Sequence, residues 1–425
     1  MSDNLTPMMR QYLEIKKECE GAILFFRLGD FYEMFFEDAV EASRILHITL
    51  TSRGQHKGVK VPMCGVPHHA AENYIARLIK SGKKVAVCEQ IEEAAEEGKK
   101  IFGRRIARIV TPGTFIAEGF STEASNSYIM SLNFNSCGFG IAYADISTGE
   151  FRLTEVDSTE RLFPEIYKIC PAETIIPKSF RDSAEMKEIR EAGLGTITIR
   201  EDWTFNSLTA EEELRRQFEV KTLESFGCSA MGSGIGAAGA LLRYLKDTQK
   251  NSLGNVRSMR VYNVTEYMTL DRVSHRHLEL VENQEDLTSS GTLYEVLDKT
   301  KTPMGKRELK RWLLNPLLDT VKISERLDAV EFFHDNNQVR VDTREILDGM
   351  YDIERLANKV ALGTANPRDM LSLADSLEKV GMMVKLSKEK FPGSLADMAS
   401  GMEDFFSVIA DKVMPEGGSF DLTQR

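Results

Sequence analysis

The sequence lacks an excess of positive charge. Its 54 Lys and Arg residues are outnumbered by 65 Asp and Glu residues, which gives a formal net charge of −11. A chain that is basic throughout is therefore excluded, and any contact with nucleic acid must come from local basic patches.

Paired cysteines and long apolar segments are also missing. The six cysteines form no Cys-x-x-Cys pair, which predicts reduced, mostly buried thiols in a cytosolic protein rather than a disulfide framework. No run of residues is apolar enough to span a membrane. Residues 1–20 are polar and charged, unlike a signal peptide.

The phosphate-binding pattern G-x-x-x-x-G-K followed by Ser or Thr does not occur in the sequence. That pattern builds the loop that cradles nucleotide phosphates in a large class of ATPases. We therefore expect this chain neither to bind nor to hydrolyse ATP, and we expect no ATP, Mg²⁺ or other cofactor in it.

At 425 residues the chain is too long for one hydrophobic core. The patterning predicts a multidomain protein with two α/β units followed by an all-α region. We expect a mixed α/β domain over 1–113 and a linker rich in Ser, Thr, Gly and Glu over 114–127. Three antiparallel strands followed by β-α units predict an RNase H-like domain over 128–250. Residues 251–425 are expected to form part of a helical domain.

An almost wholly apolar run over 22–36 predicts a buried strand. Glu33 within it needs an explanation, because burying an unpaired charge is costly. Side chains alternate along a strand, so Phe31 and Glu33 should share one face and Tyr32 should take the other. A ring beside an acid could stack on a nucleobase and accept a hydrogen bond from its edge. The plainer interpretation is a core Phe next to a salt-bridged surface Glu.

Residues 53–60 predict a basic, glycine-containing loop that carries Arg53, Lys57 and Lys60. Such a loop is most often solvated, but it could also contact phosphates, which require positive charge and no sequence code. We expect residues 62–69 to form a turn that leads into a helix. Cys64 and the two histidines of this turn do not predict zinc, because a structural site needs four ligands and no second pair follows at zinc spacing.

Two patterns in the second domain suggest chemistry. Asp145 lies where RNase H-like nucleases carry their first metal-binding Asp, but two-metal chemistry needs several clustered carboxylates, and Asp202 is the one further candidate. Residues 234–239 match G-x-G-x-x-G, which binds dinucleotides only where it follows a buried strand. The preceding segment is not a strand, so we interpret these glycines as a flexible start to a helix over 237–247.

Helical patterns dominate after residue 259. The helix over 305–314 has a basic side formed by Lys306, Arg307, Lys310 and Arg311, which is either a solvated face or a contact to phosphates or a subunit. Further helices are predicted over 323–334, 343–360, 369–387 and 405–413.

The segment Gly-Asp-Phe-Tyr-Glu-Met-Phe over 29–35 resembles the mismatch-reading motif of bacterial-type MutS proteins. Other stretches resemble the same family, in the family's order and across essentially the whole chain. They lie at 6–16, 50–53, 62–70, 74–78, 85–90, 108–114, 238–245, 304–316, 326–330 and 366–369.

The resemblance implies mismatched double-stranded DNA as the ligand. Phe31 would be the wedge that enters the duplex at a mispaired base, and Glu33 would accept a hydrogen bond from that base. The candidates for contacts to the DNA backbone are Arg53, Lys57, Lys60 and Arg77.

The resemblance also implies partners and a location. In this family two subunits encircle the DNA, and the second domain, the connector, relays the ATP state and contacts MutL. Family members are about twice this length and carry an ATPase domain, so we expect this chain to be an N-terminal piece or a truncated product that is not itself an enzyme. The expected location is the cytoplasm, associated with the nucleoid. A metal-dependent nuclease and a scaffold that does not bind DNA are the alternatives.

Overall fold

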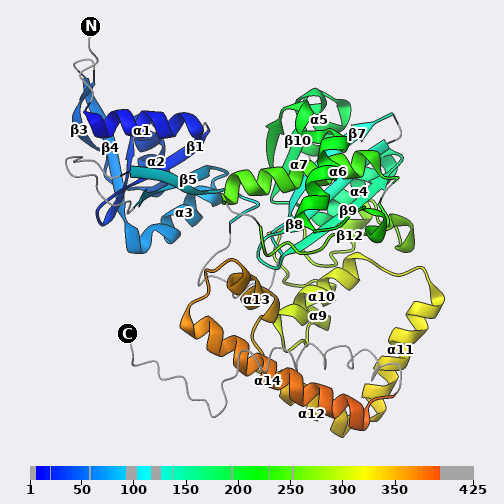
Figure 1. The fold of residues 1–425 in the computed structure, drawn as a ribbon. Coiled ribbons are helices and arrows are strands. Elements are labelled where there is room, and N and C mark those ends of the chain that lie inside the picture. Colours follow the sequence, from blue (N-terminus) through cyan, green and yellow to red (C-terminus); the bar gives the residue numbers. More distant parts are fainter. Residues whose placement is uncertain are drawn as a thin grey trace.

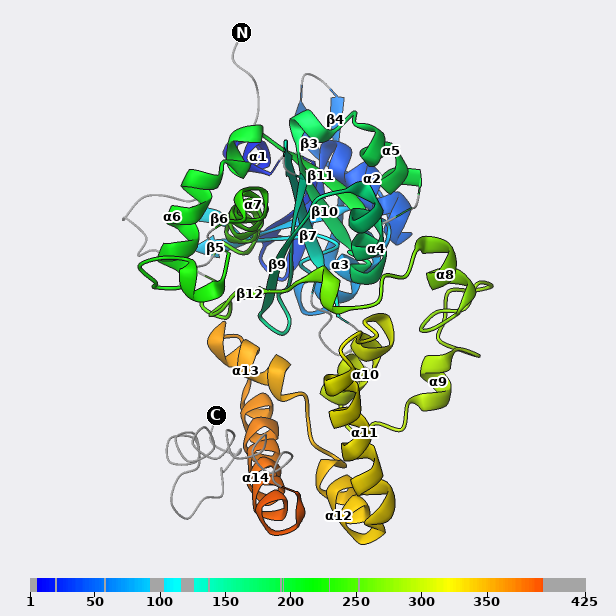
Figure 2. The same ribbon diagram turned by 90° about the vertical axis from the view of Figure 1, so that its right-hand side faces the viewer.

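The structure is a computed structural model that describes residues 6–19, 21–56, 59–91, 103–115, 126–136, 138–191, 193, 195–228, 230–250 and 253–392. It contains two six-stranded sheets, each with its own helices, and a helical region (Figure 1). The two sheet domains lie side by side, and the helical region lies beneath the second of them (Figures 1 and 2).

The first sheet has the strand order β3-β4-β2-β1-β5-β6. β1 pairs with β5 in parallel and with β2 antiparallel, so the sheet is mixed, as predicted. Helix α1 (Pro7–Glu18) packs on one face, and α2 (Phe36–Leu46) and α3 (Ala71–Lys80) pack on the other. The strands are β1 (Ala22–Leu28), β2 (Phe31–Phe35), β3 (Thr51–His56), β4 (Val59–Pro67), β5 (Lys84–Ile91) and β6 (Gly103–Val110).

Three expectations for this domain are wrong in detail. The apolar run over 22–36 is not one strand but the hairpin β1–β2, which reverses at Gly29-Asp30. The basic segment over 53–60 is not an open loop, because most of it belongs to the paired strands β3 and β4. The predicted turn over 62–69 is largely strand β4, which pairs with β2 on one side and β3 on the other.

The second sheet has the order β11-β10-β7-β8-β9-β12, with β7, β8 and β9 antiparallel and β10 and β11 parallel to β7. This arrangement confirms the RNase H-like prediction. Helices α4 (Thr159–Ile169) and α5 (Ala184–Glu191) cover one face, and α6 (Ser207–Gln217) and α7 (Gly232–Gln249) cover the other (Figure 2). The strands are β7 (Ile129–Asn135), β8 (Gly138–Asp145), β9 (Glu150–Val156), β10 (Glu173–Pro177), β11 (Thr196–Arg200) and β12 (Arg260–Val261).

The G-x-G-x-x-G residues lie inside α7 rather than before it. The helix begins at Gly232, five residues earlier than predicted, and Gly234, Gly236 and Gly239 are all buried. An added Cβ at Gly239 would lie 2.2 Å from the Cβ of Ala210 in α6. These glycines therefore allow close helix packing and bind no nucleotide phosphate.

The remaining helices form the third region. The predicted helix over 343–360 is in fact two, because the chain breaks after Leu347 and Asp352 caps a new helix by accepting a hydrogen bond from the backbone N–H of Arg355. The predicted helix over 405–413 lies outside the described residues. Among the residues described, no helix is long and apolar enough to cross a membrane. The helices are α8 (Arg272–His277), α9 (Leu293–Leu297), α10 (Pro303–Leu314), α11 (Thr320–Asp335), α12 (Asn337–Leu347), α13 (Ile353–Ala361) and α14 (Pro367–Lys390).

Candidate nucleic-acid interface

A tight turn presents the candidate residues at one end of the first sheet. Leu28 pairs with Phe31 across the hairpin, so only Gly29 and Asp30 form the loop. Gly29 has a φ of +59°, and a positive φ at the first of two loop residues is typical of a type II′ turn, in which Gly is favoured. The backbone N–H of His68 donates to the carbonyl of Asp30 at 2.8 Å, which ties the turn to the end of β4.

Phe31 is the first residue after this turn and is 48% exposed. Its neighbour Tyr32 is only 4% exposed and packs against the rings of Phe25 and His68 on the opposite face. The alternation expected along the strand is therefore present, and Phe31 is not a core residue.

Glu33 is held by Arg53. Nη1 of Arg53 donates to both carboxylate oxygens, at 2.8 Å and 2.7 Å. The side chain of Glu33 is 15% exposed and that of Arg53 is 51% exposed, so the pair lies at the surface. The plainer interpretation of this segment was right about a salt bridge and wrong about a buried ring.

Two backbone features bring Arg53 to Glu33, although strand β4 lies between their strands. The register of β3 against β4 shifts between Ser52 and Gln55, and Gly54 at this irregularity has a φ of +75°. Gly65 of β4 is the cross-strand neighbour of Glu33, and a Cβ there would lie 3.6 Å from the Cγ of Glu33. The missing side chain at Gly65 leaves space over β4 for the carboxylate and its partner.

The other predicted backbone-contact residues are not all brought together. Lys60 is exposed on β4, next to the β3–β4 hairpin end, and Lys57 lies outside the described residues. Arg77 is exposed on α3, which packs on the face of the sheet that buries Tyr32. Arg77 therefore lies on the other face from Phe31 and Glu33.

Comparison with known proteins covers nearly all of the chain. Family models for MutS domain I, MutS domain II and MutS domain III match residues 6–119, 127–257 and 273–416. The chain belongs to the MutS family.

Similar MutS proteins come from several bacteria. The DNA mismatch repair protein MutS of Syntrophomonas wolfei is 41% identical over 418 residues, which are 97% of this chain and 48% of that protein. Its namesake in Alkaliphilus oremlandii is 41% identical over 421 residues, and that in Desulfosudis oleivorans is 42% identical over 420 residues. This chain thus spans about half the length of the curated MutS relatives that it matches.

The described residues of the MutS domain II region do not assemble the metal site that a nuclease would need. Asp145 is 1% exposed and accepts hydrogen bonds from Asn126 at 2.8 Å and from the backbone N–H and the hydroxyl of Ser147. Asp202 accepts two hydrogen bonds from Ser179 instead. Among the described residues, no three His, Cys, Asp or Glu side chains come together to hold a metal ion.

Proposed function

We propose that this chain recognises mispaired bases in duplex DNA, as the mismatch-reading part of a mismatch repair protein. The observation that carries the proposal is the half-exposed ring of Phe31 at the end of a tight hairpin, beside the carboxylate of Glu33. The three relatives named above are all DNA mismatch repair proteins, which supports the same function.

Phe31 would act as an apolar wedge. Inserting a side chain between base pairs costs a few kcal/mol per step in lost stacking, and a mispaired step costs least because it is already weakly stacked. The wedge must be held rigidly for this difference to matter. The two-residue turn and the buried Tyr32 next to it hold the backbone of Phe31 in place.

Glu33 would accept a hydrogen bond from the displaced base. In the free protein Arg53 occupies both oxygens of this carboxylate. We propose that Arg53, which is half exposed, turns toward a backbone phosphate when the base takes its place. A carboxylate without such a donor is repelled by the phosphates of an intact duplex, which adds discrimination against matched DNA.

The remaining parts of the proposal concern the whole protein. Lys57 and Lys60 would contact the DNA backbone near the β3–β4 hairpin end, whereas Arg77 would need DNA on the other face of the sheet. The second domain would contact MutL, and two subunits would enclose the DNA. ATP hydrolysis, with the Mg²⁺ that it requires, would belong to the half of the relatives that this chain does not cover, so the chain itself would catalyse no reaction.

The test compares a duplex that contains a G·T mispair with its matched control. We expect the unmodified chain to prefer the G·T duplex, although weakly, because a single recognition domain lacks the avidity of an enclosing dimer. The variant Phe31→Ala should lose most of this preference, since it removes the wedge. Fluorescence anisotropy at one fixed salt concentration measures both affinities.

A matched control is Phe134→Ala, which truncates another partly exposed Phe (38%) in the second domain. This variant should retain the preference. Equal affinities of the unmodified chain for the two duplexes would refute mismatch reading, and indifference to Phe31→Ala would support a scaffold role.

A further inference from the structure

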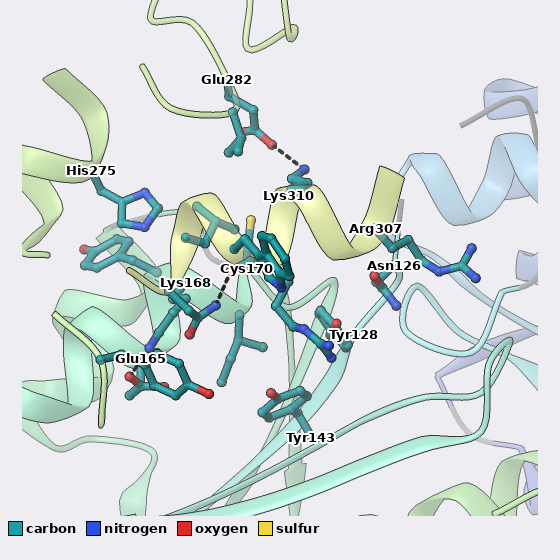
Figure 3. A pocket seen from close by; sticks show the side chains of 18 of the residues that line it. Asn126, Tyr128, Tyr143, Glu165, Lys168, Cys170, His275, Glu282, Arg307 and Lys310 are labelled. Atoms are coloured by element: carbon teal, nitrogen blue, oxygen red, sulfur yellow. Dashed lines mark hydrogen bonds and ion pairs between the residues drawn. The ribbon is translucent and has the colours of Figure 1, made fainter. Parts of the chain in front are cut away.

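A cavity of about 780 Å³ lies between the second domain and the helical region. Figure 3 shows it between strands and helix α4 of the second domain, on one side, and α8 and α10 of the helical region, on the other. Its size falls within the range of about 300–1,000 Å³ that is usual for small-molecule sites. The mismatch-reading proposal makes no use of this cavity.

The walls of the cavity are strongly basic, although the chain as a whole is acidic. Nine Lys and Arg side chains line it against three Glu side chains, which are Glu165, Glu282 and Glu308. The cations are Arg152, Lys168, Arg260, Arg272, Arg276, Arg307, Lys310, Arg311 and Arg326.

Five of these cations have carboxylate partners within the protein. Lys168 pairs with Glu165 at 2.5 Å, and Lys310 pairs with Glu282 at 3.8 Å (Figure 3). The other three cations paired in this way are Arg152, Arg307 and Arg311.

Four arginines of the cavity have no carboxylate within ion-pair distance among the described residues: Arg260, Arg272, Arg276 and Arg326. Two of them lie over aromatic rings, Arg272 at 5.5 Å from the ring centre of Tyr167 and Arg326 at 3.8 Å from that of Trp312. Ring contacts orient a guanidinium but leave most of its N–H donors available.

The four unpaired arginines line one cavity, so their positive charges repel each other, and a bound polyanion would remove that repulsion. Guanidinium groups match phosphate and carboxylate oxygens in pairs of parallel hydrogen bonds and are weakly hydrated. A phosphate group brings about −1.5 to −2 charge, more than a carboxylate, and therefore neutralises more of the cavity's positive charge. The cavity also offers an uncharged polar atom, Nε2 of His275, which is buried with no hydrogen-bond partner among the described residues.

We propose that this cavity binds a small anion that carries several phosphate groups, either a nucleoside triphosphate or inorganic triphosphate. The four unpaired arginines would hold the phosphates. The rings that line the cavity, among them Tyr143, Tyr267 and Trp312, would contact a base where the ligand has one.

The test is isothermal titration calorimetry of the chain with inorganic triphosphate and, separately, with ATP, both without Mg²⁺ and at 0.15 M salt. We expect saturable binding to one site. The double variant Arg260→Glu/Arg276→Glu should weaken the affinity about tenfold or more, because it reverses two unpaired charges in the wall. Both side chains are exposed and unpaired in the free chain, so the variant should fold.

The matched control is Arg215→Glu, which reverses an exposed arginine of α6 outside the cavity and should leave the affinity unchanged. Arg276→Gln gives a milder second variant whose affinity should fall between those of the unmodified chain and the double variant.

The comparison of the two ligands shows which groups bind them. If ATP binds more tightly than triphosphate, the rings contribute to binding; if the two bind equally, the phosphates alone suffice. Both results support the site. Absence of saturable binding by either anion, or unchanged affinity in the double variant, would overturn it. Phe31→Ala should not alter the affinity for either anion, because Phe31 does not line the cavity. The anion site and mismatch reading can therefore be refuted independently of each other.

Discussion

At the scale of single residues, the Glu33–Arg53 pair has two consequences for the proposed recognition. The pair is exposed enough to be screened by water, and surface ion pairs of this kind contribute only about 0–1 kcal/mol. It can therefore be broken at little cost when DNA arrives. Arg53 also neutralises Glu33 and so removes its repulsion from DNA phosphates before binding. It should therefore raise the affinity of the chain for any duplex, matched or mismatched.

The variant Arg53→Gln tests that role. We expect weaker binding to both G·T and matched duplexes, and a salt dependence whose log–log slope is smaller by about one unit, since one phosphate contact is lost. The preference for the mismatch should not fall. Without Arg53, the carboxylate of Glu33 can gain a hydrogen bond from a displaced base, whereas the phosphates of a matched duplex offer it no donor. Anisotropy titrations across a salt series measure both quantities.

The control for this experiment is Arg44→Gln, which removes an exposed positive charge from α2, on the other face of the sheet. It should change neither the slope nor the preference. If Arg53→Gln instead equalised the two duplexes, Arg53 rather than Glu33 would be the residue that senses the mispair.

Part of this site was predictable from the sequence, and part was not. The period of two along a strand was enough to place Phe31 and Glu33 on one face and Tyr32 on the other. The partner of Glu33 was not predictable, because Arg53 lies two strands away and reaches it through a register shift and over a glycine. No sequence spacing encodes such a contact.

At the scale of the element, local signals were overridden where strands pair on both sides. Pro62 and Gly65 are poor strand residues and favoured a turn over 62–69. Both belong to β4, which is held between β2 and β3, so tertiary pairing outweighs local preference there. The hairpin in the apolar run was not predicted for the opposite reason: a type II′ turn needs only two residues, so Gly29-Asp30 interrupts the apolar run too briefly to mark a turn.

Helix α7 gives an element-scale prediction. Gly239→Ala should lower the free energy of unfolding of the second domain by about 1–3 kcal/mol, because the new methyl group would overlap Ala210 in α6, even though Ala favours helix by about 1 kcal/mol over Gly. Urea unfolding followed by far-UV circular dichroism measures the change.

Gly232→Ala is the matched control in the same helix. Its nearest neighbour would be Nδ2 of Asn135 at 3.8 Å, an ordinary contact, so this variant should be neutral or slightly stabilising. Equal effects of the two substitutions would contradict close packing as the reason for the G-x-G-x-x-G pattern.

At the scale of the whole molecule, a buried ionic network joins the first domain to the second. Lys84 at the start of β5 pairs at 3.0 Å with Glu173 of β10, whose side chain is fully buried. Lys84 also donates to Thr198 at 2.7 Å and to the hydroxyl of Tyr244 in α7 at 3.0 Å. The network fixes the first domain against the second, and nothing in either domain's own sequence pattern predicted it.

The variant Lys84→Met should destabilise the chain strongly at neutral pH. Removing one partner of a buried pair leaves an uncompensated charge, which costs about 3–5 kcal/mol. Lys83→Met is the control at the adjacent position, because Lys83 pairs with Glu41 at the surface, where about 0–1 kcal/mol is at stake. At pH 7, Lys84→Met should therefore lower the thermal unfolding midpoint much more than Lys83→Met does.

The same pair predicts a pH dependence. Burial by itself would raise the pKa of the Glu173 carboxyl, but Lys84 and hydrogen bonds from Thr111, Thr198 and Tyr244 outweigh it and hold the pKa below its usual value. The stabilisation from Glu173 is therefore present above the unfolded pKa of about 4.3 and is lost as the pH falls through the folded pKa. In Lys84→Met the three hydrogen bonds remain but the ion pair is lost, so the pKa of Glu173 rises and its protonation relieves the unpaired charge as the pH falls. The stability difference between the two proteins should thus shrink from pH 7 toward pH 4, whereas a constant difference would show that Lys84 acts through packing rather than charge.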